Sequence, residues 1–178
     1  MKGLRLDGMP ARGVLFLGVM WTPRGPRLLE YNVRFGDPET QVLMELLDED
    51  LAPLLLEVAE GRLARTEVAL RGGCAIAVVL AAEGYPETAV QGVPIAIGSP
   101  EGVKVIHAGT RKEGGDWVTA GGRVLNLVTV GSDLFEARDR VAMALSAVVW
   151  PGMQSRHDIG LRALNHAKAG RTVHDSFD

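Results

Sequence analysis

The chain has 178 residues, of which 19 are basic and 22 are acidic, so its formal net charge is −3. A chain of this length can bury a sufficient core without disulfides or structural metal. Apolar residues make up 47% and charged residues 23%, which excludes a disordered or fibrous protein. No basic excess marks a binder of nucleic acid or membrane surfaces, and no apolar run approaches the roughly 20 residues of a membrane span.

Residues 13–35 are expected to form a β-hairpin. The first strand, residues 13–21, is almost continuously apolar, as in a strand that is buried on both faces. Pro23 and Gly25 then favour a turn, because proline restricts φ and glycine adopts positive φ. The second strand alternates over residues 28–35. One face carries Leu29, Tyr31, Val33 and Phe35, and the other carries Leu28, Glu30, Asn32 and Arg34.

Two short helices should follow the hairpin. Asp37 suits an N-cap and Pro38 suits the first helical position, so we expect a helix from Pro38 to about Leu47. A second helix should begin near Asp50 and end at Gly61. Its inward-facing residues are expected to be Leu54, Leu55 and Val58.

The hydropathy pattern changes near residues 61–65, and we place a domain boundary there. The second domain begins with short β-rich runs separated by glycine-rich turns. These runs are residues 66–70, 74–81, 103–108, 117–120 and 123–130. The expected organisation is therefore one domain over residues 1–62, a β-rich domain over residues 63–166 and a polar tail over residues 167–178.

One clear helix is expected near the end of the second domain. Asp133 and Glu136 fit a capping box at its start, and Pro151 with Gly152 ends it. Its apolar stripe comprises Ala137, Val141, Ala144, Leu145 and Val148. The predicted fold class is α+β.

Glu30 and Asn32 are the strongest local signal for chemistry. Residues two apart on a strand lie about 6.6 Å from each other on one face, so both side chains can direct an oxygen to one point. Hard cations such as Mg²⁺ take one or two such oxygens from a protein and the rest from phosphate or water. Arg34, one step along, could pair with phosphate. A polar strand face that is simply solvated fits the same spacing equally well.

The segment from Glu30 to Gln41, with residues 12–18 ahead of it, resembles the end of the ATP-grasp region of the phosphoribosylamine–glycine ligase family. Four further motifs occur in the same order as in the C-terminal domain of that family. They are Gly84-Tyr85-Pro86, His107-Ala108-Gly109-Thr110, the segment Thr119–Leu125 and Arg156-His157-Asp158-Ile159-Gly160. The resemblance extends from about residue 4 to residue 164.

The resemblance implies a purine-biosynthesis ligase that joins glycine to 5-phosphoribosylamine through glycyl phosphate, at the expense of ATP. It implies that Glu30 and Asn32 hold Mg²⁺ or Mn²⁺, and that Arg34 and Asp37 contact substrate or the phosphoryl group. Asp37 also has a sufficient structural role as an N-cap. Transfer of this kind depends mainly on neutralising charge on the phosphoryl group.

Arg156 and Arg123 are two further candidates for phosphate or cofactor binding. Related ATP-grasp enzymes use arginines near the position of Arg156 on a ribose 5-phosphate, and a guanidinium matches phosphate with two parallel hydrogen bonds. An ion pair between Arg156 and Asp158 is an equally good explanation. Arg123 follows Gly121 and Gly122, which are expected to form a hairpin turn.

The family enzyme is much longer, and its N-terminal part carries segments that bind ATP and phosphoribosylamine. We therefore expect this chain to be inactive alone and active with an N-terminal half of the ligase. The alternative is a non-catalytic module that self-associates, or binds a partner, through the apolar hairpin. Cys74 is the one cysteine, which excludes internal disulfides and favours a reducing, cytoplasmic setting.

Overall fold

The computed structural model describes residues 6–9 and 11–168, which form two compact units. The first contains the described residues up to Thr40 together with Leu47–Arg71, and the second contains Gln41–Leu46 and the described residues from Gly72 onward. Antiparallel sheets with few helices confirm the predicted α+β class. The boundary after residue 62 stays a prediction, and the expected polar tail lies outside the described residues from residue 169 onward.

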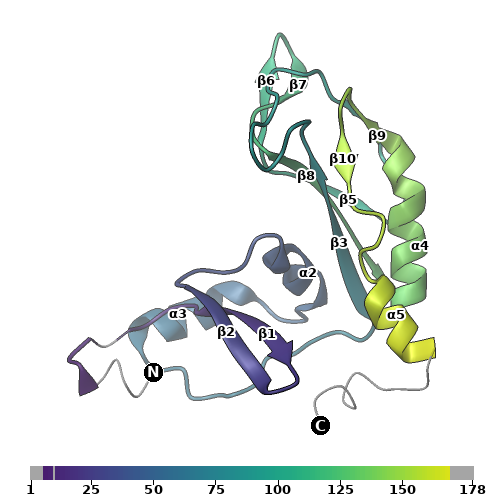
Figure 1. The fold of residues 1–178 in the computed structure, drawn as a ribbon. Helices are drawn as coiled ribbons and strands as arrows, with labels where there is room; N and C mark the ends of the chain where they lie inside the picture. Colours follow the sequence, from purple (N-terminus) through teal and green to yellow (C-terminus); the bar gives the residue numbers. More distant parts are fainter. Residues whose placement is uncertain (1–5, 10, 169–178) are drawn as a thin grey trace. The chain divides into compact units, whose positions relative to one another are not determined.

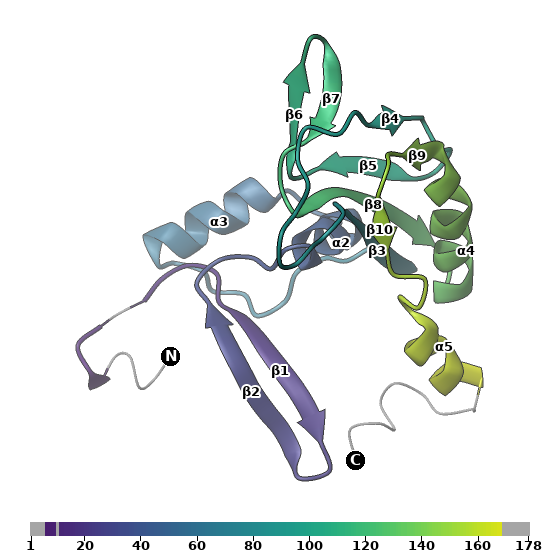
Figure 2. The ribbon, with the colours of Figure 1, turned by 45° about the horizontal axis from the view of Figure 1, so that its top comes forward.

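In the first unit, β1 (Phe16–Thr22) and β2 (Gly25–Asn32) form the predicted hairpin, seen as a two-stranded ribbon in Figures 1 and 2. The turn is tight because Gly25 adopts a φ of 90°. The Thr22 hydroxyl donates a hydrogen bond to the Gly25 carbonyl at 2.8 Å and accepts one from the Arg24 N–H at 3.2 Å. These bonds close the turn within four residues.

The predicted alternation along the second strand is only partly right. The register shifts between Gly18 and Val19, which pair with Glu30 and Leu28, so Leu29 is an extra, unpaired residue. Such a β-bulge interrupts the two-residue period, because two residues of one strand then oppose one residue of the other. Strand β2 also ends at Asn32, so the expected continuation to residue 35 is wrong.

The helices α2 (Glu39–Leu46) and α3 (Leu51–Glu60) follow. The Asp50 carboxylate caps α3 by accepting a hydrogen bond from the Ala52 N–H at 3.0 Å, and Gly61 ends the helix with a φ of 70°, both as predicted. Leu54 is buried, but Leu55 is 39% exposed, so its predicted inward position is wrong.

The segment 66–70 does not form the predicted strand. It makes one isolated β-bridge, between Leu47 and Leu70, and its Ala69 N–H donates to the Glu49 carboxylate at 2.6 Å. Strand-like sequence alone does not make a strand, because the backbone groups also need a partner strand to bond. A side chain supplies part of that bonding here.

The second unit is built on a four-stranded antiparallel sheet in the order β10-β3-β8-β5. Its long central strands are β3 (Cys74–Ala81) and β8 (Arg123–Gly131), flanked by β5 (Lys104–His107) and β10 (Gln154–Ser155). Helix α4 (Leu134–Ala144) runs along this sheet (Figure 1). Together they enclose the core, which includes Ile76, Val78, Leu80, Leu125, Leu127, Ala137, Val141 and Ala144.

Shorter elements complete the second unit. Strands β6 (Thr110–Glu113) and β7 (Asp116–Thr119) form a hairpin that projects from the sheet (Figure 2), and β4 (Ala96–Ile97) pairs with β9 (Val148–Val149). After α4 come a 3₁₀ turn η1 (Leu145–Ala147) and, nearer the C-terminus, α5 (Leu161–Lys168). Among the described residues, no helix is long and apolar enough to cross a membrane.

The predicted end of the long helix at Pro151 is wrong. Helix α4 ends at Ala144, and Val148 lies in β9, where it is completely buried. Val148 continues the apolar spacing of the helix, so its burial was predicted correctly but its backbone conformation was not. Pairing with β4 satisfies backbone groups that a longer helix would otherwise have bonded.

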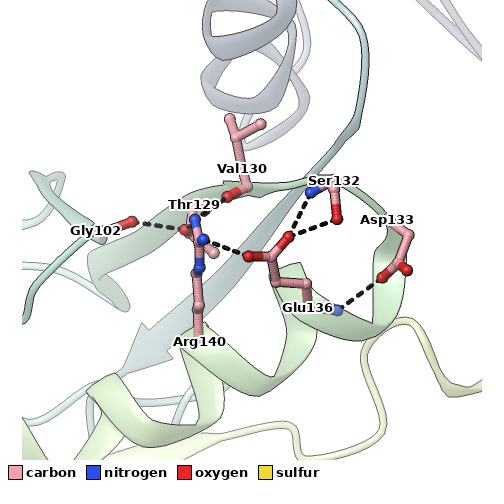
Figure 3. A network of polar contacts seen from close by, with 7 residues as sticks. All are labelled: Gly102, Thr129, Val130, Ser132, Asp133, Glu136 and Arg140. Atoms are coloured by element: carbon pink, nitrogen blue, oxygen red, sulfur yellow. Dashed lines mark hydrogen bonds and ion pairs between the residues drawn. The ribbon is translucent and has the colours of Figure 1, made fainter.

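The start of α4 is a modified capping box (Figure 3). The Asp133 carboxylate accepts a hydrogen bond from the Glu136 N–H at 2.9 Å, as predicted. The Glu136 carboxylate reaches past Asp133 and accepts from the N–H and the hydroxyl of Ser132, at 2.6 and 2.7 Å. It also pairs with Arg140, whose guanidinium donates to the Val130 carbonyl at 2.8 Å.

We predict that this network makes the second unit sensitive to acid. Hydrogen bonds from Ser132, together with the charge of Arg140, lower the pKa of Glu136. A lowered folded-state pKa contributes stability that is present above the ordinary glutamate pKa and lost as the pH falls through the folded value. Glu136→Gln should therefore flatten the dependence of unfolding midpoint on pH below about 5, measured by chemical denaturation. Glu67→Gln, a matched change at an exposed glutamate, should leave that dependence intact. If Glu136→Gln showed the same loss of stability at low pH as the unmodified chain, the prediction would be contradicted.

Candidate functional site

The carboxylate of Glu30 and the amide of Asn32 lie side by side at the end of β2. The Asn32 Nδ2 donates a hydrogen bond to the Glu30 Oε1 at 3.0 Å. Glu30 is exposed and Asn32 half-buried, and their partners across the hairpin are Gly18 and Phe16. The two polar side chains thus converge on one face, as the spacing predicted.

This pair fits a magnesium or manganese ion. Neighbouring oxygen ligands of an octahedral Mg²⁺ site with bonds of 2.0–2.1 Å lie about 2.9 Å apart, close to the observed 3.0 Å separation of Asn32 Nδ2 and Glu30 Oε1. A half-turn of the Asn32 amide places its oxygen where the nitrogen now lies. No cluster of three or more His, Cys, Asp or Glu suited to a metal occurs in the described part of the chain. Two side chains supply only a few of the six oxygen ligands that Mg²⁺ takes, so phosphate and water would provide most of the coordination shell.

Arg34 and Asp37 lie in the segment that joins β2 to α2. Arg34 is beyond the end of the strand, so its predicted place on the face of Glu30 is wrong; its guanidinium donates to the Phe35 carbonyl at 2.7 Å. The Asp37–Pro38 peptide bond is cis, and α2 begins at Glu39, one residue later than predicted. Asp37 therefore does not occupy the predicted N-cap position, and Pro38 is not the first helical residue. The Gly36 carbonyl accepts hydrogen bonds from the N–H and the hydroxyl of Thr40. Substrate contacts by Arg34 and Asp37 stay predictions.

Arg123 is the first residue of β8 and pairs with Ala81 of β3. The expected hairpin turn at Gly121 and Gly122 is wrong, because β7 pairs with β6 and not with β8. The glycines instead permit close approach. A Cβ on Gly122 would collide with the ring of Tyr85, and one on Gly109 would lie 2.8 Å from the Gly121 Cα.

Arg156 forms the ion pair that was the alternative to phosphate binding. Its Nε and Nη2 donate to the two carboxylate oxygens of Asp158 at 2.9 and 2.6 Å. The hydrogen bond from Arg156 lowers the pKa of Asp158. Arg156 and His157 line a cavity of about 110 Å³ beside Arg138, whose guanidinium donates to the carbonyls of His157 and Ile159.

The candidate residues thus fall into two groups. Glu30, Asn32, Arg34 and Asp37 belong to the first unit, whereas Arg123 and Arg156 belong to the second. Reasoning from the sequence missed Gly18, which faces Glu30 across the hairpin. No pattern in the sequence could identify it, because the pairing depends on the bulge at Leu29.

Two parts of the chain, one that contains the hairpin and one that contains most of the four-stranded sheet and α4, match domains of one protein family. Residues 1–40 match the family described as phosphoribosylglycinamide synthetase, ATP-grasp (A) domain. Residues 75–162 match phosphoribosylglycinamide synthetase, C domain. The chain therefore belongs to the phosphoribosylglycinamide synthetase family and corresponds to its C-terminal region.

Individual relatives agree with this assignment. The chain is 45% identical over 174 residues to phosphoribosylamine–glycine ligase of Mesorhizobium japonicum, covering 95% of this chain and 40% of the relative. It is 48% identical over 170 residues to that of Caulobacter vibrioides, covering 92% and 39%. The chain thus spans about 40% of the length of these relatives.

Comparison with solved structures supports the same family assignment. Phosphoribosylamine–glycine ligase from Thermotoga maritima superposes with a TM-score of 0.77 at 39% identity, over 88% of this chain and 39% of that one. A biotin carboxylase from Campylobacter jejuni, solved with an ATP analogue, superposes with a TM-score of 0.61 at 17% identity, over 92% and 37%. The latter likeness shows a shared fold alone.

We predict that hydrogen bonds from Arg156 are the main cause of the lowered pKa of Asp158 in the loop before α5. Arg156→Ala should raise the pKa of Asp158 toward the ordinary aspartate value, because the hydrogen bond that favours the carboxylate is lost. An NMR titration of the Asp158 carboxyl carbon would measure the change. Arg111→Ala, which removes an exposed arginine paired with Glu113, is the matched control and should leave Asp158 unchanged. An Asp158 pKa that ignores the loss of Arg156 would contradict the pairing.

Proposed function

We propose that this chain supplies the C-terminal part of an active phosphoribosylamine–glycine ligase. The observation that carries the proposal is the pair Glu30–Asn32, whose 3.0 Å separation suits a divalent cation that also binds phosphate oxygens. The family assignment supports it, since both matched domains come from this one ligase. The same resemblance supplies the reaction.

The proposed reaction has two steps. A carboxylate oxygen of glycine attacks the γ-phosphorus of ATP, the bond to the bridging oxygen of ADP breaks, and glycyl phosphate forms. The amine of 5-phosphoribosylamine then attacks the glycyl carbonyl carbon, loses a proton and expels inorganic phosphate. The product is glycinamide ribonucleotide. Both steps place charge on phosphate oxygens, so positioning and electrostatic stabilisation dominate the catalysis.

The residues of this chain have separate roles in the proposal. Glu30 and Asn32 hold Mg²⁺ or Mn²⁺, which when bound neutralises charge on the ATP phosphates. Arg34, which is exposed two residues after the end of β2, orients the transferring phosphoryl group, and Asp37 contacts substrate. Arg156 binds the phosphate of the sugar substrate, and Arg123 contributes to phosphate or cofactor binding. Two of the five N–H groups of Arg156 already bond Asp158, so phosphate would engage the remaining donors.

A partner that carries the rest of the ATP-grasp domain completes the proposed site. The hairpin supports this, because its strands expose apolar side chains that a complete domain would cover. Leu17, Val19, Leu29 and Tyr31 are each between 46% and 65% exposed. Two strands with no further support are marginal in water. A cytoplasmic location for the assembled enzyme stays a prediction.

We predict that Glu30 is indispensable to the ligase. With an N-terminal half supplied, Glu30→Ala should lower the rate of ADP release by orders of magnitude, because one of two protein ligands to the metal is lost. Circular dichroism should show an unchanged fold, since Glu30 is exposed. Glu67→Ala, at an exposed glutamate of the same unit, should retain full activity. Normal turnover by Glu30→Ala would remove the metal assignment, and robust turnover by this chain alone would refute the need for a second half.

Self-association is the second candidate function, and the exposed hairpin favours it. An apolar two-stranded ribbon with free edges can pair with a second copy of the same ribbon. In this case the chain would be a non-catalytic module derived from the ligase. The two candidates differ in what covers the hairpin, a second copy or an N-terminal half.

We predict that the hairpin, and not the second unit, drives any association of the purified chain. Leu17 and Tyr31 are paired across the hairpin, so the double change Leu17→Lys with Tyr31→Glu removes apolar surface while placing opposite charges in register. Light scattering should then report a smaller mean mass than for the unmodified chain. Met143→Lys, at a residue of α4 that is 71% exposed, should leave the mass unchanged. A concentration-independent monomer in the unmodified chain would exclude self-association.

A further inference from the structure

Gly18 is the one residue of β1 whose missing side chain leaves room for a candidate metal ligand. It lies directly opposite Glu30 in the hairpin register. A Cβ placed on Gly18 would lie 2.9 Å from the Glu30 Cγ, closer than such atoms approach in folded proteins. Its distances to the Glu30 Cδ and Oε1 would be 3.7 and 3.6 Å. The side chain of Glu30 thus bends across β1 through space that only glycine leaves open.

The far end of the Glu30 side chain is held on the other side. Its Oε1 accepts the hydrogen bond from the Asn32 Nδ2 at 3.0 Å. The bulge at Leu29 directly precedes Glu30, and bulges change the direction in which neighbouring side chains point. Three features therefore determine where the carboxylate lies: the empty space over Gly18, the bulge and the amide of Asn32.

We infer that Gly18 is a positioning residue, whose lack of a side chain places the Glu30 carboxylate beside Asn32 for metal binding. The inference rests on the proposed function, because it concerns the same metal pair. Any larger residue at position 18 would push the Glu30 Cγ away. Glu30 is exposed, so a change of its rotamer costs little energy, and the fold would survive while the pair of ligands separates.

A substitution at position 18 can therefore move the Glu30 carboxylate without unfolding the hairpin. Ordinary contact between Cβ atoms across an antiparallel pair spans about 4.5–5.5 Å, so alanine at position 18 is compatible with the strand itself. Gly18 does not need positive φ, unlike Gly25 in the turn. Gly18→Ala should therefore keep the hairpin and lose the ligand arrangement.

The test uses the full chain, labelled for NMR, with and without Mn²⁺. In the unmodified chain, a nuclear Overhauser effect should connect the Gly18 Hα protons with the Glu30 Hγ protons. The Asn32 side-chain amide should have the shift of a hydrogen-bonded group. In Gly18→Ala, that amide should move to the shift of a free amide while the cross-strand backbone contacts of β1 and β2 persist.

Mn²⁺ alone, added in millimolar steps, probes the metal side of the inference. It should broaden the resonances of Glu30 and Asn32 in the unmodified chain, and Gly18→Ala should need about tenfold more Mn²⁺ for equal broadening. Gly72→Ala is the matched control, because Gly72 has ordinary φ and open space around its Cα. It should change neither readout.

The outcomes separate the two ideas. An unaltered Asn32 amide shift in Gly18→Ala would overturn the positioning role of Gly18, whatever Mn²⁺ does. A clear shift of that amide with no Mn²⁺ broadening in the unmodified chain would support the positioning role and count against a metal site formed by this pair without phosphate. If Gly18→Ala lost the hairpin, the unmodified chain would still decide: scalar couplings that show several Glu30 χ1 rotamers would overturn the inference.

Discussion

Antiparallel strand pairing is the constraint on which both units depend. In the second unit, β8 pairs with β3 on one side and β5 on the other, and the run from Val124 to Thr129 is completely or almost completely buried. Because β8 is held on both edges, α4 has a fixed surface to cover. In the first unit, one pairing between β1 and β2 sets the place of every candidate metal ligand. Strand register is thus the link between folding and chemistry in this chain.

The two units differ in how completely they bury their apolar residues. The second has a continuous core under α4, with Leu80, Leu125 and Leu127 inaccessible to water. The hairpin of the first leaves most of its large apolar side chains more than 40% exposed. Burial is the main source of stability in folded chains, so the second unit has the means to fold independently, while the hairpin gains most from a covering surface. This difference explains why the proposed activity and the proposed self-association both involve the hairpin.

Much of the fold was predictable from local patterns. The turn at Gly25, the caps at Asp50 and Gly61, and the strand at 74–81 depend on residues close together in the sequence. Errors arose where a distant partner decided the outcome. Leu29 became a bulge because of its register with β1, and Val148 joined β4 and left the helix that its spacing suggested. Residues 66–70 have strand-like composition but only one bridging partner.

The sequence by itself determined the class, the family and the identity of the polar pair, because motifs and two-residue spacing are properties of the chain alone. Only the tertiary structure decided which neighbours that pair has. It set Gly18 under Glu30, moved Arg34 off the strand and joined Arg156 to Asp158. The position of Gly18 follows from strand register, that of Arg34 from the end of β2 at Asn32, and the Arg156–Asp158 pair from the fold of a loop; spacing along the sequence specifies none of these. The sequence identifies the side chains that could carry out the chemistry, and strand pairing sets their positions.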